Sequence, residues 1–204
     1  GEAEPYVGEG RSKVETYMNE LIATPTRDSL ERRFSDFGTL GEALDYAASG
    51  DRGLNFHDMR GQLARPYPYR ELRDDALAAA RRLIAEGVKP KDRVALIAET
   101  GQQFAALFFG AVYAGAWPVP LPLPTSFGGR DHYVDQLSVQ LGSCDAAILL
   151  YPAELAEMAG AAAAACSVPS CSWEDFASKA QSDDALPSAA PEDIAYLQYS
   201  SGST

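Results

Sequence analysis

Apolar and polar positions follow two different periods along this chain, and the change of period marks the expected elements. Apolar residues at helical spacing, or around most of a helix, predict helices over residues 40–50, 69–87, 101–115, 130–142 and 153–165. Nearly continuous short apolar runs predict buried strands at residues 92–98, 116–121, 146–151 and 194–199. Weaker signals predict extended pieces at 53–58 and 65–69, and a short helix within 172–181 that Ser172 caps.

The order of these elements predicts the fold class. A strand, a helix and a second strand within about thirty residues form the spacing of a βαβ unit, so the strands are expected to be parallel. The unit repeats, which predicts an α/β layered sandwich with a largely parallel sheet over residues 37–204. Residues 1–36 differ in pattern and are expected to form an amino-terminal extension with two short helices, Thr26 or Asp28 capping the second.

Composition and charge then exclude one class of function. Hydrophobic residues make up 46% of the 204 residues, which suits a globular protein with a sizeable core. The chain carries 29 acidic and 17 basic residues, for a formal net charge of −12. Because no basic stripe is available to neutralise phosphates, a nucleic-acid partner is not expected. An anionic ligand would need backbone N–H groups or a metal ion.

Cysteine usage and the amino terminus predict a cytoplasmic protein. Cys144, Cys166 and Cys171 form no CxxC pair, and only His57 and His132 could join them, so no protein-held metal site is expected. Such a sparse, odd set of thiols suits a reducing compartment. The first ten residues lack the apolar core of a signal peptide, and the apolar run at 104–124 is too interrupted to span a bilayer.

The last predicted strand runs into a stretch of hydroxyls and glycine, which is the candidate binding site. Ligands of open α/β sheets bind at the carboxyl ends of strands, and small residues let the backbone approach them closely. Successive N–H groups and rotatable hydroxyls would suit a polyphosphate. The chain has no GxxxxGK[ST] or GxGxxG motif, and a flexible surface turn remains the alternative. The candidate residues are Ser200, Ser201, Gly202, Ser203 and Thr204.

Three stretches together resemble the large amino-terminal domain of the adenylate-forming superfamily. This superfamily includes acyl-CoA synthetases, nonribosomal peptide adenylation domains, luciferases and fatty acyl-AMP ligases. The first stretch has Tyr69, Leu72, Leu83, Gly87 and Val88 followed by "DRVAL" at 92–96. The second is "FAALFFGAVYAGAWPVPL" at 104–121, and the third is "YLQYSSGST" at 196–204, which is similar to the start of the phosphate-loop motif.

Two details are most similar to the fatty acyl-AMP ligases: "LQY" before the loop and "PLPLPTSFGGRDHYVDQL" at 120–137. The resemblance implies that a fatty acid and ATP form an acyl-adenylate, with Mg²⁺ assisting, and that the acyl group passes to an acyl carrier protein. Ser200 to Thr204 would hold the β- and γ-phosphates. An acyl-CoA synthetase or an amino-acid adenylation domain stays an alternative, as does a non-catalytic interaction module.

The resemblance also implies that further functional parts follow the phosphate loop in the family. The chain is therefore expected to be about the first third of an enzyme, truncated at the phosphate loop and inactive alone, and no catalytic residue is assigned in it. Other conspicuous side chains have simpler explanations. His57 and His132 are expected at the surface, and core filling explains the cluster at Phe104, Phe108 and Phe109 better than an acyl tunnel does.

Overall fold

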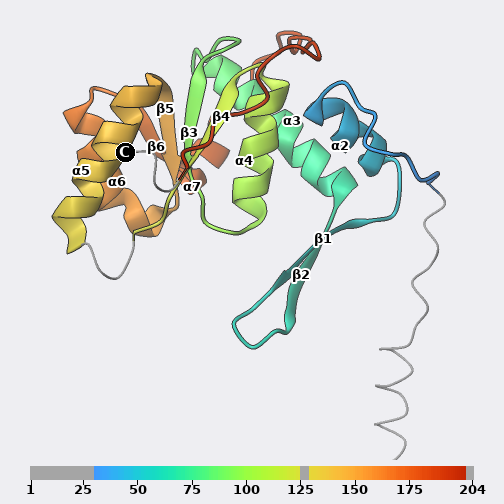
Figure 1. Cartoon of the computed structure of the whole chain (residues 1–204), viewed down its shortest axis with the longest axis horizontal. Coiled ribbons are helices and arrows are strands. Elements are labelled where there is room, and N and C mark those ends of the chain that lie inside the picture. Colours follow the sequence, from blue (N-terminus) through green and yellow to red (C-terminus); the bar gives the residue numbers. More distant parts are fainter. Residues whose placement is uncertain (1–29, 125–128, 201–204) are drawn as a thin grey trace, which may run out of the picture.

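A computed structural model of the chain describes residues 30–124 and 129–200, and its elements follow the order that the sequence predicts (Figure 1). The helices are α2 (Leu40–Ala48), α3 (Tyr69–Ala85), α4 (Gln102–Tyr113), α5 (Gly129–Cys144), α6 (Ala156–Ala165) and α7 (Trp173–Ala177), with a 3₁₀ turn at Ala153–Leu155. The strands are β1 (Gly53–His57), β2 (Leu63–Pro68), β3 (Arg93–Ile97), β4 (Trp117–Leu121), β5 (Ala146–Tyr151) and β6 (Ser170–Ser172). Of the two helices predicted within residues 1–36, the first lies outside the described residues; the second, expected after Thr26 or Asp28, is not seen in residues 30–36, which have no helix.

The central sheet has four strands in the order β4-β3-β5-β6, and all neighbouring strands are parallel. The predicted α/β class with a parallel sheet is therefore confirmed. Strand β6 has three residues and was not predicted, because "SCS" carries no apolar run. The predicted cap at Ser172 is confirmed: its hydroxyl accepts a hydrogen bond from the Asp175 N–H at 3.1 Å.

Helices cover both faces of this sheet, as Figure 1 shows for α5 and α6 on one side and α3 and α4 on the other. Within β3, Val94 and Leu96 pack with α3, α4 and α7, whereas Ala95 and Ile97 pack with α5 and α6. All four side chains are fully buried. A strand buried on both faces needs apolar residues at every position, and this explains why the strands lack an alternating pattern.

A close approach between α3 and α4 depends on Gly110. A Cβ atom placed on Gly110 would lie 2.6 Å from the Cβ of Ala79 and 3.1 Å from the carbonyl oxygen of Ala76. The two helices therefore pack at a distance that only a glycine at this position permits. This contact fixes α4, which connects two strands of the sheet, against the long helix α3.

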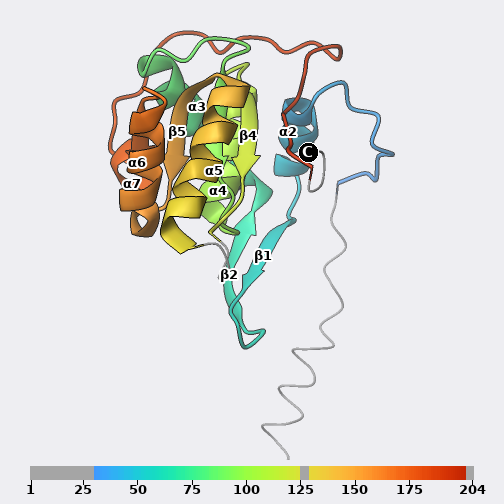
Figure 2. The same cartoon turned by 60° about the vertical axis from the view of Figure 1, so that its left-hand side comes forward.

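The two predicted extended pieces form an antiparallel hairpin, β1–β2, that projects from the body (Figure 2). Most of its side chains are exposed, but Tyr67 is buried and packs with Leu44 and Leu72. The Tyr67 hydroxyl also donates a hydrogen bond to the Asp75 carboxylate at 2.7 Å. Tyr67, together with the partly buried Leu54 and Phe56 of β1, thus attaches the hairpin to α2 and α3.

The strand predicted at residues 194–199 is wrong for the described structure, where this segment has no regular secondary structure. The prolines of β4 give the physical reason. Hydrogen bonds to β3 use Trp117 and Leu121, so residues 118 and 120 direct their backbone groups toward the opposite edge. Both are prolines and have no N–H to donate. The segment therefore makes one backbone bond here, from the Leu197 N–H to the Pro118 carbonyl at 3.0 Å.

Candidate functional site

The predicted phosphate-binding residues fall at the end of the described structure. Ser200 is described and exposed, whereas Ser201, Gly202, Ser203 and Thr204 lie outside the described residues. Their role in binding phosphate stays a prediction. The described part of the candidate site is the segment that leads into it, residues 194–200, together with the surfaces that hold this segment.

Side chains attach the segment to both faces of the domain. The Tyr196 ring meets the Phe108 ring edge-on, with centroids 5.7 Å apart. Leu197 points to the other side and packs with the cluster formed by β4, α5 and α6. The alternation is that of a strand, although the ladder of backbone bonds is missing. The prediction of a buried strand here is therefore wrong for the side chains as well, because Leu197 is half-buried and Ile194, Tyr196 and Tyr199 are exposed.

Tyr199, the residue directly before the hydroxyl stretch, is held at the carboxyl end of α5. Its phenol donates a hydrogen bond to the Gln140 carbonyl at 2.8 Å and also bonds to the Ser143 hydroxyl. Burial raises the pKa of the Tyr199 phenol, and the Ser143 bond partly opposes that rise. The phenol is therefore protonated at neutral pH and can act as the donor.

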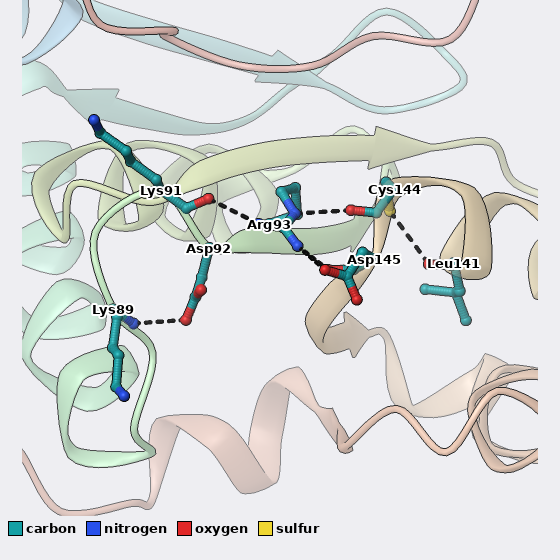
Figure 3. A network of polar contacts seen from close by, with 7 residues as sticks. All are labelled: Lys89, Lys91, Asp92, Arg93, Leu141, Cys144 and Asp145. Carbon is teal, nitrogen blue, oxygen red and sulfur yellow. Dashed lines mark hydrogen bonds and ion pairs between the residues drawn. The ribbon is translucent and has the colours of Figure 1, made fainter.

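Arg93 fixes the same end of α5 to the start of β3 (Figure 3). Its Nε donates to the Cys144 carbonyl at 2.8 Å, and one terminal nitrogen donates to the Asp145 carbonyl at 2.7 Å. The other terminal nitrogen donates to the Lys91 carbonyl at 3.1 Å. Lys91 and Asp145 both have positive φ, 71° and 51°, so the guanidinium stabilises two turns that glycine usually occupies.

The arginine also completes the end of a helix electrostatically. The last carbonyls of α5 lack partners within the helix and carry partial negative charge. A cation beside them, here the Arg93 guanidinium, is therefore stabilising. The "DRVAL" stretch was predicted to be a strand and a family motif, and this role of Arg93 was not predicted. The signal for the missed role was a charged residue at the first position of an otherwise apolar strand.

A cavity of about 690 Å³ borders the beginning of the segment, at the amino edge of the sheet. Its walls come from the start of α2, from the turns before β3 and β4, and from residues 187–195. Ligands of parallel sheets bind at the opposite, carboxyl edge. The cavity is therefore not assigned as the phosphate site. The end of α5 that holds Tyr199 lies at the same amino edge, because β5 starts directly after it, so the described residues do not confirm that the hydroxyl stretch follows the carboxyl end of a strand.

The structure places the remaining candidates in ordinary roles. Phe104 and Phe108 pack against the core cluster of α3, α4 and α7, and Phe109 packs against the cluster of α2, α3 and the hairpin. Core filling is thus confirmed for them. His57 and His132 are exposed, as expected.

Within residues 30–124 and 129–200, no three His, Cys, Asp or Glu side chains gather closely enough to hold a metal ion. No magnesium ligand is therefore assigned among these residues. In the same residues, no helix has the length and apolar character that a membrane crossing requires.

Sequence comparison shows the family. The AMP-binding enzyme family matches residues 56–204, and the chain therefore belongs to this family of adenylate-forming enzymes. A Caulobacter vibrioides protein, whose name assigns it provisionally to the acyl-CoA synthetases, is 45% identical over 192 residues. That match covers 91% of this chain and 32% of the relative. A long-chain fatty acid–AMP ligase of Mycolicibacterium smegmatis is 31% identical, over 80% of this chain and 25% of the relative.

Structure comparison gives the same family. A structure from a study of fatty acyl-adenylate ligases of E. coli and L. pneumophila superposes with a TM-score of 0.80 at 42% identity. It covers 83% of this chain and 31% of the solved chain. The L. pneumophila fatty acyl-adenylate ligase in complex with acyl adenylate and pyrophosphate superposes at 0.67 with 26% identity, over 86% and 30%. The matches thus span about a quarter to a third of the length of these relatives.

Proposed function

We propose that the protein to which this chain belongs activates a fatty acid with ATP and passes the acyl group to an acyl carrier protein. The observation that carries this proposal is the 42% identity, at a TM-score of 0.80, to a structure from a study of fatty acyl-adenylate ligases. In this proposal residues 37–204 are the amino-terminal part of the adenylation domain of a cytoplasmic enzyme, and residues 1–36 are an extension. The activity belongs to the longer protein, and residues 1–204 alone do not form acyl-AMP.

The proposed reaction has two balanced steps. A carboxylate oxygen of the fatty acid attacks the α-phosphorus of ATP, the bond to the β-phosphate oxygen breaks, and pyrophosphate leaves. The sulfur of the phosphopantetheine arm then attacks the acyl carbon, its proton is lost, and AMP leaves. The first step brings a carboxylate against a triphosphate, so the protein must offset the repulsion between negative charges.

The candidate loop suits a part of this task. In this proposal the backbone N–H groups and hydroxyls of Ser200 to Thr204 bind the β- and γ-phosphates, because small residues let the backbone approach the oxygens. This holds the departing pyrophosphate while the α-phosphorus stays open to attack. Mg²⁺, when bound with ATP, supplies charge neutralisation that the acidic chain does not.

One observation favours free coenzyme A as the acceptor of the acyl group in the second step. The 45% identical relative bears a name that assigns it provisionally to the acyl-CoA synthetases. The two candidates share the adenylation step and differ only in the acceptor thiol.

The test uses the full-length protein with a series of fatty acids. We expect exchange of radioactive pyrophosphate into ATP that depends on the fatty acid, and transfer of the acyl group to a phosphopantetheinylated carrier protein at least tenfold faster than to coenzyme A. Absence of exchange across all chain lengths would refute the adenylation proposal. Faster loading of coenzyme A would instead support the second acceptor.

A further inference from the structure

The hairpin β1–β2 has only two strands, and most of its side chains are exposed where it projects from the body (Figure 2). A two-stranded hairpin is marginally stable in water by itself, whereas a third strand or a covering element gives independent stability. Contacts of Tyr67, Leu54 and Phe56 hold its base. The backbone groups along its two edges show whether a further strand can join it.

The register of the hairpin shows which backbone groups point away from it. In an antiparallel pair of strands, residue pairs that exchange hydrogen bonds alternate with pairs that do not. The Tyr69 N–H donates to the Arg52 carbonyl at 2.9 Å. The pair two positions along, Leu54 and Tyr67, is therefore hydrogen-bonded, and the residues on either side of it direct their N–H and C=O groups outward.

The two edges of the hairpin differ in the groups that they present. On β2 the outward-directed residues are Pro66 and Pro68, which have no N–H to donate. Their partners on β1, Asn55 and Gly53, are exposed, and each keeps both an N–H and a carbonyl. Among residues 30–124 and 129–200, these outward groups form no hydrogen bond. Prolines thus block the β2 edge, and the β1 edge is open.

The side chains beside the open edge also lack part of their cover. Leu54 and Phe56 lie on the same face of β1 and pack on the cluster of Leu44, Tyr67 and Leu72, yet both are only half-buried. A strand beside β1 would place every second residue on that face, next to these two side chains. The edge therefore fits an extended segment with apolar residues at alternate positions.

The lengths of the relatives indicate the source of such a segment. The solved structures with TM-scores of 0.80 and 0.67 align with this chain over 31% and 30% of their own length, so most of each relative lies outside the match. A segment of the same molecule reaches the hairpin without the loss of translational freedom that a second copy incurs. Residues 1–29 are a less suitable source, because their sequence predicts helices.

We propose that the β1 edge pairs with a strand from the part of the longer protein that follows residue 204, one with apolar residues at alternate positions. This strand accepts hydrogen bonds from the N–H groups of Gly53 and Asn55, donates to their carbonyls, and covers Leu54 and Phe56. The hairpin thus becomes part of a larger sheet that joins two portions of the same molecule. The inference concerns packing, so it holds or fails independently of the proposed function.

The first experiment measures hydrogen exchange at single residues of the full-length protein, by mass spectrometry with electron-transfer fragmentation. Two N–H groups are the references: that of Leu54, bonded within the hairpin, and that of Met59 at the exposed tip, which has no partner among the described residues. After correction for intrinsic rates, we expect the Asn55 N–H to exchange within about tenfold of Leu54 and about 100-fold more slowly than Met59. Exchange of Asn55 at the rate of Met59 would overturn the proposal.

A photocross-link then identifies the strand. The Asn55 side chain is exposed, so p-benzoylphenylalanine in its place lies on the open edge, and the same residue in place of Met59 at the tip is the control. We expect illumination to join position 55, within one molecule, to a peptide that follows residue 204, and this product to be absent from the Met59 control. A cross-link between two copies, a cross-link to residues 1–29, or the absence of any cross-link would each contradict the proposed strand.

Discussion

Replacement of Gly110 by alanine tests the close packing of α3 on α4. The added Cβ would lie 2.6 Å from the Cβ of Ala79, whereas carbon atoms pack at about 3.5–4.0 Å. The backbone oxygen of Ala76 at 3.1 Å and the backbone nitrogen of Ala80 at 3.3 Å close the other directions. No flexible side chain is available to move aside, so the helices must separate.

The magnitude follows from two opposing effects. Overpacking of a tight core costs about 1–3 kcal/mol, and rigid neighbours place this site at the upper end. Alanine in place of glycine within a helix recovers about 1 kcal/mol. We therefore expect Gly110→Ala to lower the free energy of unfolding by about 2 kcal/mol, measured by equilibrium urea denaturation followed by circular dichroism.

Gly160 provides the matched control. It lies inside α6, and a Cβ there would meet no atom within 4 Å. The same substitution should raise the free energy of unfolding by about 0.5–1 kcal/mol, through helix propensity alone. If Gly110→Ala were as stable as the wild type while Gly160→Ala gained as expected, the close approach of the two helices would not be the reason for the glycine.

Two further predictions concern polar groups. Arg93→Lys keeps the charge but cannot replace the three N–H bonds that Arg93 directs to backbone carbonyls, so we expect it to lower the free energy of unfolding by about 1–3 kcal/mol. As the control, Arg60→Lys in the exposed turn of the hairpin should not change the free energy of unfolding measurably. Equal stabilities of Arg93→Lys and the wild type would contradict a stabilising role for these Arg93 hydrogen bonds. Burial raises the pKa of Tyr133 to about 12, whereas the pKa of the same phenol in the unfolded chain is near 10. Between these two values the unfolded chain loses the proton and the folded protein keeps it. The stabilisation is therefore fully present below pH 10 and is lost as the pH rises through 12. Urea denaturation should thus show a steeper loss of stability between pH 10 and 12 in the wild type than in Tyr133→Phe, and parallel slopes would refute the assignment.

The sequence predicted the sheet and its helices because burial on both faces leaves a strong pattern. The run at 146–151 is apolar throughout, and the structure places it in the sheet as β5. The helix predicted over 69–87 is α3, which ends near Gly87 at a positive φ of 89°. In each case the side chains that gave the signal are the ones that the fold buries.

The site was harder to predict because it depends on contacts between distant residues. The apolar run at 194–199 predicted a strand, but the missing donors are on β4, more than seventy residues earlier. The partners of Tyr199 on α5 precede it by 56 and 59 residues, and no local period indicates them. The hydroxyl stretch was identified by composition and family resemblance, and its phosphate-binding role stays a prediction.

The prolines of β4 have a consequence beyond the segment beside them. A sheet margin with regularly spaced free donors can recruit strands from other molecules, and proline on the outer strand is one natural protection against such aggregation. During synthesis, residues 93–151 can pair into β3, β4 and β5 before residues 194–199 leave the ribosome. At that stage the outer side of β4 would be bare, and a strand from a neighbouring nascent chain would find carbonyls at Pro118 and Pro120 but no N–H groups.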